Sequence, residues 1–178
     1  MFLKHGAAVA VILWLTPFAV AHAEWGESVS AQDGFTASWP ATPRQSNNVD
    51  EGVALRFYTA ARGKAACFVV VADYPTAVDP NEETRASRDN FVENIRGTVI
   101  SSRNTTLARG TTPLPAIEFD ARGDKSTYRS MIVVEGARVY MVGGGVPIEG
   151  GANADLDQCV RGFKLTPGYR VPVAAQAR

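Results

Sequence analysis

Two tight-turn signals within residues 117–142 constrain the fold of this chain more than any other feature. Apolar and polar side chains alternate through much of this segment, which is the period expected of β-strands with one buried face. Gly123-Asp124 and Gly136-Ala137 interrupt the alternation as two-residue hairpin turns. The segment therefore predicts three consecutive antiparallel strands.

Centring the turns on these dipeptides determines which residues lie opposite each other. In the first hairpin Glu118 faces Arg129 as a structural ion pair, and in the second Val134 faces Val139. The two registers assign one sheet face to Ile117, Phe119, Tyr128, Ile132, Val134, Val139 and Met141. They assign the other face to Glu118, Arg129, Met131, Val133, Tyr140 and Val142. A slip of one residue would exchange the two faces.

The second of these faces is a candidate binding surface. It presents Arg129, Met131, Val133 and Tyr140, and exposed aromatic and arginine side chains are favoured anchors for a partner. Its apolar character has a second interpretation, in which a helix covers the face and makes it part of the core. Both interpretations remain open from the sequence.

The rest of the chain predicts further strands and two helices. Alternating or apolar runs predict strands at 35–39, 53–58 and 66–72, and a weaker one at 98–107 that leads into a loop at 112–115. Asp79 and Pro80 predict the start of a helix that ends near Gly97. A second, short helix follows Asn153 and buries Leu156, Cys159, Val160 and Phe163. The predicted class is α+β, with an antiparallel sheet of about six to seven strands flanked by helices.

Residues 1–23 have the pattern of a secretory signal peptide. Lys4 precedes an uncharged apolar run from Ala7 to Leu15, and Ala21-His22-Ala23 provides a cleavage site. The run is too short to span a bilayer, and no cysteine follows the site to carry a lipid. We expect a periplasmic or secreted protein with a flexible segment at 24–33, one domain at 34–165 and a disordered tail at 166–178.

Cleavage would remove both histidines, His5 and His22, and with them the commonest acid–base and metal-binding side chain. The remaining charges nearly balance, with 18 acidic residues against the 18 basic ones less Lys4. They form no basic cluster, so no nucleic-acid partner is expected, nor stable membrane insertion. No pattern in the sequence calls for a cofactor or a metal.

Cys67 and Cys159 are the two cysteines of the chain, and both lie in the part predicted to be exported. An oxidising compartment favours a structural disulfide between them. The alternative is two buried free thiols, since free cysteine is among the most buried residue types.

Several short motifs resemble the Mog1/PsbP-like superfamily, in which an antiparallel sheet lies between helices. They are Gly34-Phe35-Thr36-Ala37-Ser38-Trp39-Pro40, Asp73-Tyr74-Pro75, Pro115-Ala116-Ile117-Glu118-Phe119, Arg138-Val139-Tyr140 and Phe163-Lys164-Leu165. The likeness extends over residues 33–165. It implies a role in interaction or assembly, and it transfers no catalytic residue.

The sequence therefore favours an exported, non-catalytic binding or accessory module whose partner is an envelope protein or a small ligand. The alternative is a carboxylate-dependent hydrolase that works without histidine, with Asp73, Glu118, Asp120 and Glu149 as candidates. The run Asp79–Glu83 is explained better by helix capping than by calcium binding. Gly143-Gly144-Gly145 is explained better as a strand end than as a phosphate-binding loop.

Overall fold

A large antiparallel sheet and a small one form the body of the molecule. The computed structural model describes residues 25–149 and 153–172, so the predicted signal peptide lies outside the described residues. The large sheet has the strand order β3 (Arg44–Asp50), β4 (Val53–Arg62), β5 (Ala65–Asp73), β9 (Arg138–Pro147), β8 (Ser126–Glu135), β7 (Thr112–Arg122), β6 (Thr98–Arg109). The small sheet consists of β1 (Gly26–Ser30), β2 (Phe35–Trp39) and β10 (Lys164–Leu165).

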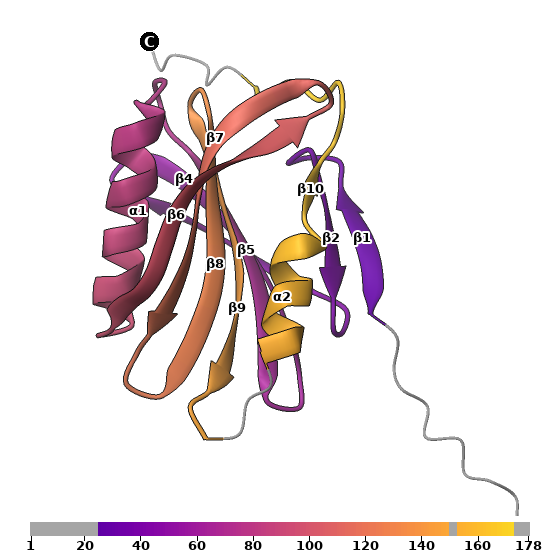
Figure 1. The fold of residues 1–178 in the computed structure, drawn as a ribbon. Coiled ribbons are helices and arrows are strands. Elements are labelled where there is room, and N and C mark those ends of the chain that lie inside the picture. Colours follow the sequence, from indigo (N-terminus) through magenta and orange to yellow (C-terminus); the bar gives the residue numbers. More distant parts are fainter. Residues whose placement is uncertain (1–24, 150–152, 173–178) are drawn as a thin grey trace, which may run out of the picture.

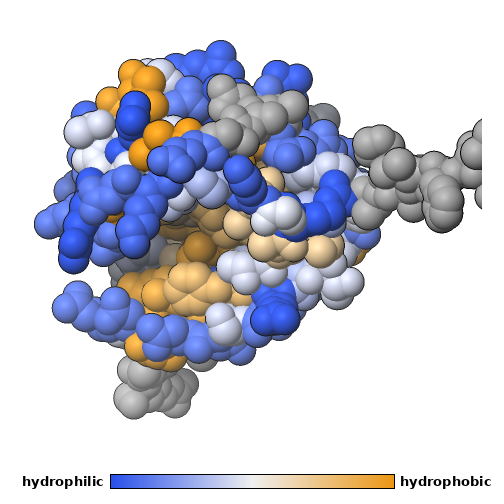
Figure 2. Space-filling model, turned by 90° about the horizontal axis from the view of Figure 1, so that it is seen from below, coloured by the Kyte–Doolittle hydropathy of each residue, from blue (hydrophilic) through white to orange (hydrophobic). Residues whose placement is uncertain are grey.

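The two helices lie on opposite faces of the large sheet. Helix α1 (Pro80–Asn94) packs on β6, β7 and β8, whereas α2 (Asn153–Arg161) packs on β5, β8 and β9 beside the small sheet (Figure 1). The predicted α+β class with an antiparallel sheet is confirmed. Seen from below, hydrophilic residues cover most of the surface, and hydrophobic ones gather in a hollow between them (Figure 2).

Both predicted faces of the meander are found in the structure. The α1 side buries Ile117, Phe119, Ala121, Ile132, Val134 and Val139 against the helix. The other side buries Met131, Val133, Tyr140 and Val142 against the small sheet and α2, together with residues that include Phe35, Trp39, Val69 and Phe163. Period-two alternation was thus sufficient to assign these side chains to a face.

The two hairpin registers have different outcomes. The second is confirmed, with Val134 opposite Val139. The first is wrong by two residues, because Ile117 lies opposite Ile132 and not opposite Ser130. The two residues at the tip of the turn are Asp124 and Lys125. Gly123 lies just before the tip, and its N–H donates to Ser126 O at 2.9 Å. A shift of two leaves every side chain on its predicted face, because the strand period is two.

The predicted start of α1 at Asp79 and Pro80 is confirmed. The helix ends at Asn94, shortly before the predicted stop at Gly97. Asp79 Oδ1 accepts hydrogen bonds of 2.9 Å from both Asn81 N and Glu82 N, so this residue caps the helix. At the other end the left-handed residue is Arg96, with φ of 49°, and Gly97 N–H then donates to Val92 O. The capping bonds are those of a Schellman motif that uses arginine at the position where glycine is usual.

The three glycines Gly143, Gly144 and Gly145 lie within β9 and do not end it, which corrects the prediction. A Cβ on Gly143 would lie 2.8 Å from the Phe68 ring, and one on Gly145 would lie 2.7 Å from the Tyr128 ring. On the opposite face, a Cβ on Gly144 would lie 2.6 Å from Cys159 Sγ. Glycine therefore leaves room for aromatic rings of the neighbouring strands β5 and β8 on one face and for the disulfide of α2 on the other.

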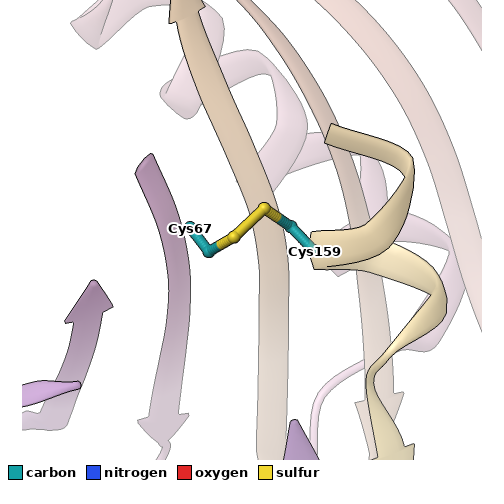
Figure 3. Close-up of a disulfide and its surroundings, with 2 residues drawn as sticks. All are labelled: Cys67 and Cys159. Carbon is teal, nitrogen blue, oxygen red and sulfur yellow. A yellow bond between two sulfur atoms is a disulfide. The ribbon is translucent and has the colours of Figure 1, made fainter. Parts of the chain in front are cut away.

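Cys67 and Cys159 form a disulfide that joins β5 to α2 (Figure 3). The two residues are 92 positions apart, their Cα atoms are separated by 5.5 Å, and both are buried. The predicted pairing is confirmed. A buried disulfide fits an oxidising compartment such as the periplasm or the extracellular space.

Both segments predicted to be loose at the domain ends are ordered where the structure describes them. Gly26–Ser30 is strand β1, which pairs with β2. After β10, Thr166 N–H donates to Gly34 O at 2.9 Å and the Tyr169 hydroxyl donates to Gln32 O at 2.5 Å. The flexible segment at 24–33 and the start of the disordered tail were therefore wrong predictions. Residues 24 and 173–178 lie outside the described residues.

Candidate functional site

Most of the predicted binding face is core. Met131, Val133 and Tyr140 are at most 4% exposed, because β2, β10 and α2 cover this side of the sheet. The interpretation in which a helix covers the face was correct in kind, although a small sheet does much of the covering. Arg129 alone of the four keeps an accessible side chain, at 38% exposure.

Arg129 lies in a cleft of about 380 Å³ between strands β6–β8 and helix α2. We call this the α2 cleft. Its lining combines three arginines and three carboxylates with two serines, a phenylalanine and a valine: Ser101, Ser102, Arg103, Glu118, Phe119, Asp120, Arg129, Asp157, Val160 and Arg161. A site with equal numbers of cations and anions suits a ligand that carries both charges.

The Arg129 guanidinium links the sheet to α2. Its Nε donates to Asp120 Oδ1 at 2.8 Å, and its Nη1 donates to Asp157 of the helix. The hydrogen bond from Arg129 lowers the pKa of Asp120 below its ordinary value. Burial acts in the opposite direction, and a hydrogen bond of 2.8 Å from the Ser101 hydroxyl lowers the pKa further. Asp120 is therefore ionised at neutral pH and has no proton to give.

The predicted ion pair between Glu118 and Arg129 is wrong. The two-residue shift in the hairpin places Asp120 opposite Arg129. Glu118 instead accepts from Arg103 Nε at 2.9 Å, across the β6–β7 hairpin. The role of Arg103 as the partner of Glu118 was not predicted, because residues 112–115 were expected to form a loop. In the structure these residues begin β7. Gly110-Thr111 is the turn signal that would have placed Arg103 opposite Glu118.

A second set of charges lies on the same sheet face, beneath the small sheet. We call Asp33, Arg56, Asp73 and Arg138 the buried ionic cluster. Asp33 accepts from Arg56 Nε at 2.7 Å and from the Tyr58 hydroxyl at 2.6 Å. Asp73 accepts from Arg56 at 2.5 Å and from Arg138 at 2.5 and 2.7 Å. Burial alone would raise the pKa of Asp73, but the hydrogen bonds from Arg138 and Arg56 outweigh it and lower the pKa.

The segment after β10 closes over this cluster. The guanidinium groups of Arg138 and Arg109 lie 5.6 and 5.2 Å from the centre of the Tyr169 ring. Arg138 also donates to the Tyr169 hydroxyl at 2.7 Å, and Arg109 donates to Glu135 at 2.7 Å. With Asp33 and Arg138 at most 2% exposed, this cluster joins the two sheets, and its most accessible member is Asp73 at 26% exposure.

The four carboxylates considered for hydrolysis do not form one site. Glu118 and Asp120 line the α2 cleft, Asp73 belongs to the buried ionic cluster, and Glu149 is exposed in the turn after β9. A glycosidase needs one carboxyl group with a raised pKa to act as the acid. Glu118 and Asp120 of the cleft are instead ion-paired with arginines, and the hydrogen bond from Arg129 lowers the pKa of Asp120.

No family model and no curated protein matches the chain. Among solved structures it is similar to a crystal structure from Bacteroides thetaiotaomicron VPI-5482, with 13% sequence identity and a TM-score of 0.38. That match covers 82% of this chain and 50% of the other, so this chain spans half the length of the structure it matches. No helix among the described residues is sufficiently long and apolar to cross a membrane.

Proposed function

We propose that the protein is an exported, non-catalytic binding or accessory module of the bacterial cell envelope, with a Mog1/PsbP-like fold and the α2 cleft as its binding site. The observation that carries the proposal is the pairing of every cleft carboxylate with an arginine at an accessible surface. Such an arrangement offers fixed charges to a ligand, and the lowered pKa of Asp120 leaves that carboxyl group without a proton for acid catalysis.

The accessible charges of the cleft define the chemistry of the ligand. Arg103 and Arg161 have side chains that are 75% and 79% exposed, and both lie at the cleft beside a carboxylate partner. Exposed ion pairs are weak, so a ligand's own charges can replace either partner at little cost. We therefore expect a segment of an envelope protein that carries both acidic and basic side chains.

The disulfide supports the same role. It fixes α2, which carries Asp157, to β5 in the core, so one wall of the cleft is held covalently. A preformed site loses less conformational entropy when it binds than a flexible one does. The signal peptide pattern and the resemblance to Mog1/PsbP-like proteins support export and an interaction role.

The proposal is tested by photo-crosslinking in cells that express the full chain. A photoreactive residue replaces Arg103 at the cleft or Arg85 on the exposed side of α1 as a matched control. We expect a protein adduct of defined mass from position 103 and none from position 85. Adding Arg129→Glu should abolish the adduct, because it puts a third acidic group beside Asp120 and Asp157. Equal adducts from both positions would contradict the proposal.

The hydrolase alternative is separated by a second measurement. Purified protein is incubated with envelope glycans, and released reducing ends are counted for the wild type, Asp120→Asn and Glu118→Gln. The binding-module proposal predicts no release from any of the three. Release by the wild type that either substitution abolishes would establish the hydrolase in its place.

A further inference from the structure

Strand β3 leaves one edge of the large sheet open. It is an end strand of the sheet and pairs only with β4 among the strands that the structure describes. All seven of its side chains are exposed, and Val49 is 70% exposed. An edge strand of this kind carries a row of unpaired N–H and C=O groups, which can pair with another strand.

The sheet face next to this edge is also incompletely covered. Helix α1 packs on β6, β7 and β8, at the opposite end of the sheet. The apolar side chains that β4 and β5 present on the α1 side are only half-buried: Val53, Leu55, Phe57, Phe68 and Val70. An apolar stripe thus reaches almost to the open edge.

The sequence of β3 is complementary to itself in charge. Consider two copies paired antiparallel, with Asn47 opposite Asn47 of the second copy. Arg44 then lies opposite Asp50 of the second copy, and two-fold symmetry creates this pair twice. Among the described residues neither Arg44 nor Asp50 has an ion-pair partner of its own.

The other edge of the sheet lacks these properties. Strand β6 has a bulge between Val99 and Ser101, which disturbs a regular hydrogen-bond ladder. Its charged side chains, Arg103 and Arg109, are both cations, so a second copy would bring no opposite charge. Of the two edges of the large sheet, β3 alone combines an exposed, regular edge with self-complementary charges.

We propose that the protein forms a two-fold dimer in which β3 pairs antiparallel with β3 of a second copy. Paired antiparallel strands keep side chains of one face on one side, so the two sheets become continuous. The apolar stripes of the two copies then lie on the same side, flanked by the two α1 helices. The reciprocal pairs between Arg44 and Asp50 set the register.

Charge reversal tests the register directly. Analytical ultracentrifugation measures the mass of protein expressed from the full chain, over a range of concentrations. We expect twice the monomer mass for the wild type at high concentration. Arg44→Asp alone and Asp50→Arg alone should each give a monomer, because each places like charges opposite one another twice.

Two further samples show whether a monomeric single variant results from charge repulsion in this register or from a disturbed fold. An equimolar mixture of the two single variants should form a heterodimer, since one variant is then acidic at positions 44 and 50 and the other is basic at both. The double variant Arg44→Asp/Asp50→Arg should again dimerise. Arg103→Asp, on the β6 edge, is the matched control and should dimerise like the wild type. A wild type that stays monomeric at every concentration, or single variants that dimerise fully, would overturn the proposal.

Discussion

The buried ionic cluster and the α2 cleft both contain arginine–aspartate ion pairs on the same sheet face, but their central arginines differ in burial. Both consist of arginines that bridge pairs of aspartates: Arg138 contacts Asp33 and Asp73, and Arg129 contacts Asp120 and Asp157. Arg138 is 2% exposed, whereas Arg129 is 38% exposed. The small sheet and Tyr169 cover the first set, and nothing among the described residues covers the second.

The difference in burial distinguishes ion pairs that hold the fold together from ion pairs that are open to a ligand, which the residue types alone do not. In the buried ionic cluster Asp33 and Arg138 have lost nearly all contact with water, so they depend on their partners and cannot exchange them. At the cleft, water screens each pair, so partners can be exchanged for those of a ligand. Four experiments would sharpen or break this distinction.

Removing Arg138 should have the largest effect. Arg138→Met leaves the charge of Asp33 buried and takes two hydrogen bonds from Asp73. Loss of one partner of a buried ion pair costs about 3–5 kcal/mol in free energy of unfolding. Chemical denaturation of the purified variant measures this loss. A variant as stable as the wild type would show that the cluster is not structural.

Removing the disulfide should have the next largest effect. Cys67→Ala/Cys159→Ala should lower the free energy of unfolding by about 2–5 kcal/mol. Amide hydrogen exchange should become faster in α2, where Asp157 would lose its fixed position, and change little in β9 around Arg138. Equal acceleration in both elements would contradict the separation of the two sets of charges.

Acid should destabilise the protein through both sets of charges. The pKa values of Asp73 and Asp120 are lowered in the folded state, so their stabilising contribution is complete above the ordinary aspartate pKa of about 3.9. It is lost as the pH falls from there through the folded-state pKa. Unfolding free energies measured from pH 7 to pH 2 should fall less steeply in Asp73→Asn and in Asp120→Asn than in the wild type. An unchanged slope in either variant would contradict the assigned ion pairs.

Removing Arg129 should have the smallest effect on stability. Arg129→Met breaks ion pairs that water already screens, and pairs of this kind contribute about 0–1 kcal/mol. The same denaturation experiment as for Arg138→Met makes the two substitutions directly comparable. A loss as large as that of Arg138→Met would mean that the cleft, too, is primarily structural.

The parts of the fold that depend on period-two alternation could be predicted from the sequence. Alternation assigned the side chains of the meander to their faces even where the register was wrong, because an error of two residues preserves the face. The cap at Asp79 and the disulfide were predictable because each depends on a local or compositional signal. Export and the family resemblance remain predictions.

The two sets of charges were much harder to predict. Arg138 and Asp73 continue the alternation of Tyr140 and Val71, so each occupies a core position at the end of a strand. A charge at such a position requires a partner, but no local pattern identifies it. In β4 the more apolar alternation, Leu55 and Phe57, lies on the less buried face, because the small sheet covers the opposite one.

The glycines of β9 also bear on how this protein can change over generations. A methyl group at Gly144 would press on the sulfur that ties α2 to the sheet, and one at Gly143 or Gly145 would press on aromatic rings of the adjacent strands, on the α1 side of the sheet. One short stretch of backbone thus sets both the distance of α2 from the sheet and the room for side chains on the other face. Natural variation should spare these three positions, and the outward surface of α1 should diverge freely.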